Sequence, residues 1–255
     1  MPRVNPDQFD PNPAQRFFEW DGADGLVCYY NKEKKENVVI NLPFKFVLLN
    51  RVCSIRGWHE PSKSGIISNE IKDTREQILT VRAFKGGTIA TGLYRDIKDK
   101  VVVAGGHYTA NLYVAVRLDP KAKEMAVAQL QLKGAGLNAW VEFERQHRDG
   151  LYTKGIAITG KVEGKNGKIV FQSPVFEFIE ISKETDDEAA KLQQQVADYL
   201  TRYFAKSSTA KVDSAAEAPQ PDAPEGADPG PAAPAAPTSP TKPQPAEPEE
   251  DDIPF

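Results

Sequence analysis

The alternation of hydrophobic and polar positions is the main structural signal between residues 25 and 181. Short segments rich in Val, Ile, Thr and aromatic residues are separated by turn residues such as Gly86-Gly87 and Gly105-Gly106. Closely spaced short segments of this kind are typical of the strands of a β-barrel or a β-sandwich. The predicted strands are 25–30, 37–42, 44–49, 51–59, 66–71, 77–84, 88–94, 101–104, 107–118 and 125–132.

The pattern changes to helical spacing after residue 135. Leu137, Trp140, Val141 and Glu144 recur at intervals of three or four, which predicts one short helix over residues 136–148. Two long strands, 151–163 and 168–181, then return as a hairpin, because the intervening Gly-Lys-Asn-Gly is a strong turn signal.

A second, longer helix is predicted over residues 185–205. Thr185 and Glu188 have the spacing of a capping box at its start. One side of this helix is apolar, so we expect it to pack on the body or on another subunit. The apolar positions are Ala189, Leu192, Val196, Tyr199, Leu200 and Tyr203.

Charge and composition divide the chain near residue 207. Residues 207–255 hold ten acidic residues and two lysines, a net charge of −8, together with 12 of the 20 prolines. The remaining 30 basic and 26 acidic residues give residues 1–206 a net charge of +4. Proline, alanine and acidic residues without large apolar side chains cannot offset the entropy of chain ordering, so we expect a disordered acidic tail. The proline-rich residues 1–15 are expected to form an extended arm.

Composition also excludes several classes of protein. No apolar stretch reaches the length of a signal peptide or a transmembrane helix, so a cytoplasmic location is expected. Two cysteines are too few for a disulfide framework, and no metal site or cofactor is predicted. Phosphate-binding loops, nucleophile elbows and HExxH pairs are missing from the sequence, and its three histidines are scattered, so we expect no catalysis.

Basic and aromatic residues share the non-core side of several predicted strands. Alternation pairs Arg56 with Trp58 and Arg82 with Phe84, and it directs Tyr113 outward. Stacking rings combined with cations are what a sequence-independent single-strand binder needs, although ordinary solvated strands have similar patterns. The candidate stacking residues are Trp58, Phe84, Tyr94 and Tyr113, and the candidate phosphate contacts are Lys45, Arg56, Arg82, Arg95 and Arg117.

The last residues of the chain, Glu-Pro-Glu-Glu-Asp-Asp-Ile-Pro-Phe, favour the binding interpretation. This ending resembles the C-terminal tip of bacterial single-stranded DNA-binding proteins. In that family the tip docks on replication, recombination and repair proteins. The resemblance implies that Ile253 and Phe255 enter an apolar pocket while Asp251, Asp252 and the terminal carboxylate meet basic residues around it. Pro254 belongs to the same expected partner-binding tip.

The body is longer than the compact bacterial domain and is more similar to the single-stranded DNA-binding proteins of bacteriophages. That resemblance carries the expected fold: a mainly β body over residues 16–206, built as an elaborated OB-type barrel with one inserted short helix, a C-terminal amphipathic helix and the acidic tail. It leaves open whether the protein forms a homo-oligomer and whether it is encoded by a bacterium or a phage.

The predicted function is protection of single-stranded DNA in replication, recombination or repair. Three alternatives stay open: an RNA-binding protein that uses the same groove, a nuclease or other DNA-processing enzyme that carries a docking tail, and an adaptor that binds only protein. A nuclease would need clustered carboxylates for a divalent metal, whereas the acids of the body are scattered.

Overall fold

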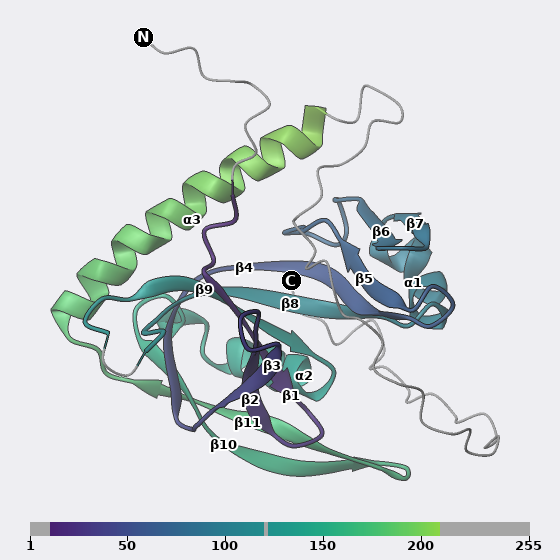
Figure 1. Ribbon diagram of the computed structural model, residues 1–255. Helices are drawn as coiled ribbons and strands as arrows, with labels where there is room; N and C mark the ends of the chain where they lie inside the picture. The colour runs from purple at the N-terminus through teal and green to yellow at the C-terminus, as the bar shows by residue number, and fades with distance from the viewer. Residues whose placement is uncertain (1–10, 120–121, 210–255) are drawn as a thin grey trace.

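The computed structural model describes residues 11–119 and 122–209, and these form a mainly β structure (Figure 1). Its strands are β1 (Arg16–Asp21), β2 (Leu26–Asn31), β3 (Glu36–Ile40), β4 (Phe44–His59), β5 (Ser64–Ser68), β6 (Leu79–Ala83), β7 (Gly87–Gly92), β8 (Gly106–Val116), β9 (Ala126–Lys133), β10 (Gly155–Asn166) and β11 (Ile169–Ile179). Its helices are α1 (Tyr94–Val103), α2 (Ala135–Gln146), a 3-10 turn (Arg148–Gly150) and α3 (Lys183–Thr209).

The described strands form one open sheet in the order β3-β2-β1-β9-β8-β4-β5-β6-β7. The hairpin β10–β11 branches from this row, because β10 pairs with the first residues of β4. All pairs are antiparallel except β1 with β9, which run parallel. The long strands β4 and β8 pair over almost their whole length and therefore connect the two ends of the sheet.

One side of the sheet, which we call the core face, holds most of the buried apolar residues. Alternate positions such as Leu112, Leu130 and Ile55 point to this side, and each is fully buried. Helix α2 covers the part made by β1, β8, β9, β10 and β11, while α1 covers the part near β5, β6 and β7. Burying these side chains against two helices is the main apolar contribution to the fold.

The opposite side, which we call the α3 face, is only partly covered. Helix α3 lies diagonally across β4, β8 and β9 (Figure 1) and buries a second apolar cluster between the helix and the sheet. Val52, Tyr113 and Val127 of the sheet contact Val196 and Leu200 of the helix within this cluster. The rest of the α3 face, toward β5 and β6, carries no helix.

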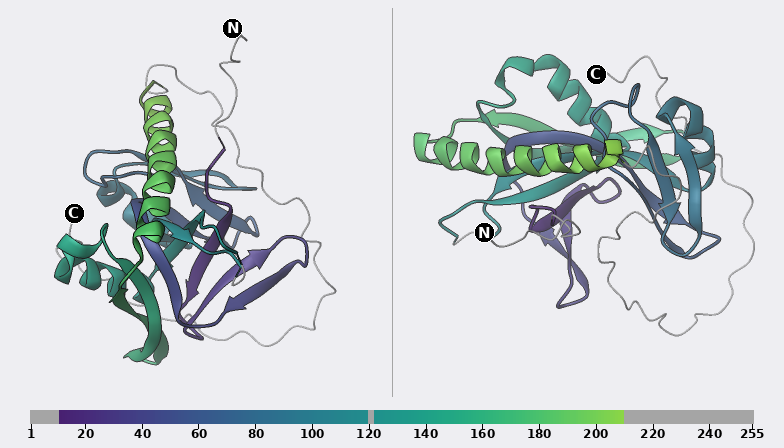
Figure 2. Two further views of the ribbon diagram at one scale, coloured as in Figure 1. Left: turned by 90° about the vertical axis from the view of Figure 1, so that its left-hand side faces the viewer. Right: turned by 90° about the horizontal axis from the view of Figure 1, so that it is seen from above.

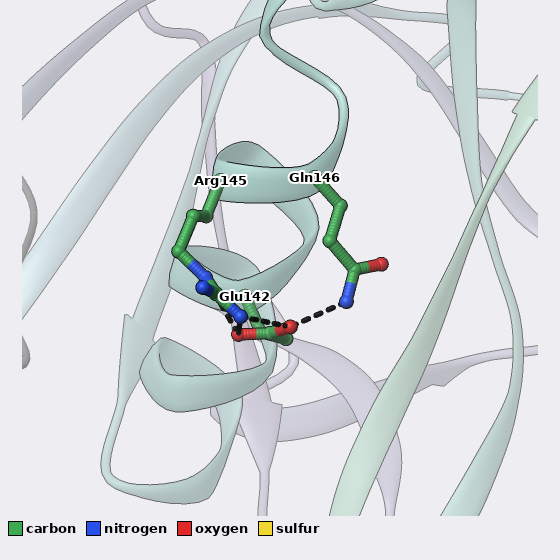
Figure 3. A network of polar contacts seen from close by, with 3 residues as sticks. All are labelled: Glu142, Arg145 and Gln146. Carbon is green, nitrogen blue, oxygen red and sulfur yellow. Dashed lines mark hydrogen bonds and ion pairs between the residues drawn. The ribbon is translucent and has the colours of Figure 1, made fainter.

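Helix α2 has a solvent-exposed side opposite its buried Trp140 and Phe143. There Glu142 accepts hydrogen bonds from Arg145, at 2.9 Å, and from Gln146 (Figure 3). Exposed pairs of this spacing add only a few tenths of a kcal/mol to a helix, roughly 0.2–0.5 kcal/mol each. The position of α2 is therefore set by its buried side.

Within the described part of the chain, no helix combines the length and apolarity needed to span a bilayer.

The mainly β body, the short helix, the long hairpin and the C-terminal helix are confirmed. Three strand predictions are wrong in detail: residues 101–103 belong to α1, with Ala104 as its C-cap, and the segments 44–49 and 51–59 form the single strand β4. The strand β1 was not predicted. Whether the body is an OB-type barrel stays a prediction, since the sheet is open.

The boundaries at the two ends of the chain shift slightly. Ser182, rather than Thr185, caps α3, because its hydroxyl accepts a hydrogen bond from the Thr185 amide at 3.2 Å. Glu188 instead accepts one from the Met125 amide at 2.7 Å and so joins the helix to the start of β9. Helix α3 extends to Thr209, two residues past the predicted start of the tail at residue 207. Residues 1–10 and 210–255 lie outside the described part.

Replacing Leu200 by Ala should destabilise the protein by about 2–5 kcal/mol, because it leaves a cavity between α3 and the sheet. Urea unfolding followed by circular dichroism would measure the change. Gln195→Ala, at an exposed position of the same helix, is the matched control and should shift the free energy of unfolding by less than about 0.5 kcal/mol. Equal stability of the two variants would contradict the packing of α3 on the sheet.

Candidate nucleic-acid interface

The uncovered part of the α3 face brings together four residues that the sequence predicts as nucleic-acid contacts. Arg56 and Trp58 belong to β4, Arg82 belongs to β6 and Phe84 follows it. Pairing places them in two rows across three strands. Arg56 lies opposite Ile67 of β5, which lies opposite Arg82. Trp58 lies opposite Gly65, and the amide of Phe84 donates to the Gly65 carbonyl at 3.1 Å. We call these six residues the Trp58–Phe84 site.

Two rings in this site are open to solvent. Trp58 is 54% exposed and Phe84 is 46% exposed, so both present a face that a base could stack on. Gly65 lies between them, and a Cβ atom there would come within 3.2 Å of the Phe84 ring. The absence of a side chain at Gly65 therefore allows Phe84 to lie close over β5. The indole nitrogen of Trp58 donates to Glu60 at 3.0 Å, which fixes the orientation of that ring.

Arg56 is the cation nearest to the centre of the site. Its Nε atom is buried and has no hydrogen-bond partner among the described residues. Burial lowers the pKa of the guanidinium, and the charges of Glu70, Tyr113 and Tyr203 partly offset this. A buried donor without a partner costs free energy, about 1–3 kcal/mol and more for a charged group, so such a group commonly binds an anion or water. Arg56 lies two residues before Trp58 on β4 and therefore points to the same side of the strand.

A buried carboxylate, Glu70, lies below Arg56 on the same side of the sheet. It accepts hydrogen bonds from Asn111 at 3.2 Å, from Tyr113 at 2.9 Å and from Gln129 at 2.8 Å. Its backbone amide donates to the hydroxyl of Tyr203, in α3, at 2.8 Å. Burial raises the pKa of Glu70, while these hydrogen bonds and the charge of Arg56 act in the opposite direction. The group thus connects the loop after β5 to β8, β9 and the end of α3.

Two predicted stacking residues are not available for stacking. Tyr113 does lie on the side that alternation predicts, but α3 covers it completely, and its ring packs 6.4 Å from that of Tyr199. Tyr94 begins α1 and is buried on the core face, where its ring lies 5.0 Å from that of Tyr108. The prediction that these two rings are exposed is therefore wrong. Strand parity cannot show which part of a strand a distant helix covers.

The remaining predicted cations lie away from the Trp58–Phe84 site. Arg95 is exposed on α1, which covers the opposite face of the sheet, and pairs with Asp96 at 3.5 Å. Lys45 and Arg117 are exposed at the far ends of β4 and β8. Thirteen residues separate Lys45 from Trp58, which is about 40 Å along the strand. The partner-binding residues Asp251, Asp252, Ile253, Pro254 and Phe255 lie outside the described residues.

Sequence reasoning missed Glu70 and Gly65. Glu70 is a single acid near the end of the predicted strand 66–71, and only its tertiary contacts distinguish it from a solvated residue. Gly65 lies just outside that predicted strand, whereas it belongs to β5. No group of three or more His, Cys, Asp or Glu side chains within the described ranges is arranged to hold a metal ion.

Comparison with known proteins gives no match: no family model, curated protein or solved structure is similar to this chain.

The raised pKa of Glu70 predicts how the free energy of unfolding depends on pH. Because that pKa is raised in the folded protein, the folded state holds the proton more tightly than the unfolded chain, so Glu70 stabilises most at low pH. Its contribution is lost as the pH rises from about 4.5, its ordinary value, through the raised value. The free energy of unfolding of the wild type minus that of Glu70→Gln should therefore fall over this range, with a slope of at most about 1.4 kcal/mol per pH unit.

Urea titrations at a series of pH values would measure this difference. Glu177→Gln, which neutralises an exposed carboxylate on β11, controls for the loss of one negative charge. A difference between wild type and Glu70→Gln that stays constant from pH 4 to 8 would show that the carboxyl is not held in the buried network.

Proposed function

We propose that the protein binds single-stranded DNA without base specificity through the Trp58–Phe84 site, and that its acidic C-terminal tip recruits replication, recombination or repair proteins. The observation that carries the first part is the buried Nε of Arg56, which has no hydrogen-bond partner within residues 11–119 and 122–209 and lies beside two exposed rings. A phosphate would supply the missing acceptor while adjacent bases stack on Trp58 and Phe84.

The surroundings of the site support binding rather than a purely structural role. Arg82 lies one strand beyond Ile67 and adds a second cation at the level of Arg56. Lys85 and His107 are exposed next to the two rows. A cationic surface with flat rings binds the features that all single strands share, namely phosphates and the faces of bases.

The proposal includes an OB-type body. OB-folds are partly open barrels that bind oligonucleotides on one sheet face, so an open curved sheet with one partly uncovered face is compatible with this class. Here α2, between β9 and β10, packs against one end of the apolar core.

RNA binding is the second candidate, because stacking and phosphate contacts are equally available to both nucleic acids. Competition between oligo(dT) and oligo(U) for the same site would separate the two. A nuclease stays a third candidate, and incubation of a labelled oligonucleotide with Mg²⁺ would reveal cleavage.

Replacing Trp58 or Phe84 by Ala should each weaken oligo(dT) binding by roughly 1–3 kcal/mol through loss of stacking. Trp20 and Trp140 are buried, so quenching of tryptophan fluorescence on binding should come from Trp58 and should disappear in Trp58→Phe. Tyr152→Ala is the matched control, because Tyr152 is 50% exposed and interacts with Arg51 and Glu144, on the side of the sheet that α2 covers. Unchanged affinity in both Trp58→Ala and Phe84→Ala would refute the site.

The salt dependence of binding tests Arg56 separately. Each phosphate neutralised by a cation contributes about 0.7 to the slope of log K against log salt for a single strand. Arg56→Gln should therefore weaken binding and reduce that slope by about 0.7. A variant with the wild-type slope would show that Arg56 does not contact a phosphate.

The tip is tested by two variants of the last five residues. Deleting residues 251–255 should abolish capture of replication or repair proteins, and Phe255→Ala should do the same because it removes the apolar anchor and keeps the acidic charges. DNA affinity should be unchanged in Phe255→Ala and unchanged or higher at low salt in the deletion. Partner capture that survives both changes, or weaker DNA binding by the deletion, would contradict this role.

A further inference from the structure

A second group of exposed apolar side chains lies on the same side of the sheet as the Trp58–Phe84 site. Phe17 of β1 is 45% exposed, Tyr30 of β2 is 52% exposed and Val39 of β3 is 50% exposed. Glu19 lies opposite Cys28, and Cys28 lies opposite Val39, so these three residues point to the same side of the sheet. Phe17 and Tyr30 are two positions from Glu19 and Cys28 along their strands and therefore also point to that side. We call Phe17, Tyr30 and Val39 the Tyr30 patch.

The strand register shows that the Tyr30 patch lies on the α3 face of the sheet. Phe17 lies beside Gln129 of β9, and Gln129 lies opposite Tyr113 of β8. Tyr113 contacts α3, which identifies the side. The same alternation continues through Asn111 and His107 to Arg56. The Tyr30 patch and the Trp58–Phe84 site therefore lie on the same side of the sheet, separated by β9 and β8, where Gln129, Tyr113 and Asn111 are buried.

The exposed residues between the two groups are polar and include one ion pair, Lys133 with Glu19. Lys133, at the end of β9, is 49% exposed, and its nearest acid is Glu19 at 4.0 Å. Gln131 is partly exposed beside it, and His107 is exposed on β8. An exposed ion pair of that length contributes little, so a phosphate can replace Glu19 as the partner of Lys133 at small cost.

The shape of the sheet brings the two groups to the same side of the molecule. Strands β1–β3 and strands β5–β7 extend from the central strands in the same direction, away from α2 (Figure 2, right). Six strand-to-strand steps separate β6 from β2, which corresponds to about 29 Å at roughly 4.8 Å per step. The register also offsets the two groups by six residues of β8, from Tyr113 to His107, which is about 20 Å along the strands. About ten stacked nucleotides at roughly 3.4 Å each would join the two groups.

We propose that Phe17 and Tyr30 form a second stacking position for the same single strand, which crosses the sheet from β6 to β2 with Lys133 and His107 between the two positions. This inference rests on the proposed function and adds a path and a length to it. Long oligonucleotides contact both groups of rings, whereas short ones contact only one.

Oligonucleotide length is therefore the variable that tests the path. Affinities for oligo(dT) of about four and about 16 nucleotides, the limits of known site sizes for such folds, would be measured for the full chain and for Tyr30→Ala, Phe17→Ala and Trp58→Ala. Tyr30→Ala and Phe17→Ala should weaken binding of the long oligonucleotide by roughly 5- to 150-fold and leave the short one within about two-fold. Trp58→Ala should weaken both.

The outcomes separate this inference from the function on which it rests. If Trp58→Ala weakens binding while Tyr30→Ala and Phe17→Ala bind the long oligonucleotide like the wild type, the path is wrong and the Trp58–Phe84 site stands. If Tyr30→Ala weakens both lengths equally, the two-position path is also wrong. If none of the variants differs from the wild type, the proposed function fails as well. Tyr152→Ala and thermal melts of each variant control for nonspecific effects.

Discussion

The position of α3 on the sheet depends on one buried carboxylate, that of Glu70. Its oxygens accept hydrogen bonds from Asn111, Tyr113 and Gln129, while its amide binds the hydroxyl of Tyr203 near the end of the helix. A carboxyl removed from water is costly unless such partners surround it, so the loop, the two strands and the helix must keep one mutual arrangement. That arrangement fixes which part of the sheet α3 covers, and thereby which part stays open.

The part of the α3 face that α3 covers and the part that it leaves open carry different residues. Val52 and Tyr113 lie under the helix, whereas Arg56 and Trp58, a few residues further along β4, lie beyond it. Arg56 lies near enough to Glu70 for its charge to favour the guanidinium, yet its Nε has no hydrogen-bond partner in the described part of the chain. A buried donor atom of this kind could bind an anionic ligand with little loss of side-chain entropy.

The strands β4 and β8 are long enough to contribute both to the apolar core and to the α3 face along most of the sheet. Their core-facing residues join the cluster under α2 to the cluster under α1, so the apolar core continues along the sheet. Their other side extends from the helix-covered cluster to the rings of Trp58 and Phe84. An irregularity of β4 between Leu48 and Asn50 reverses the alternation of side chains, so Val47 and Leu49 before it and Val52 after it all face α3. A scaffold of this kind can hold stacking residues at fixed spacing.

The sequence by itself determined the elements and the sides of the strands. Alternation correctly placed Arg56 with Trp58 and Arg82 with Phe84 on one side, because side-chain direction in a strand depends only on parity. It also predicted α3 and its apolar side, since a stripe at helical spacing needs no tertiary information. Tertiary structure alone decided what covers what: Tyr113 has the predicted direction but lies under α3, and Tyr94 belongs to a helix on the opposite face. Burial depends on contacts between residues far apart in the chain, such as Glu70 with Tyr203, and no local pattern encodes those contacts.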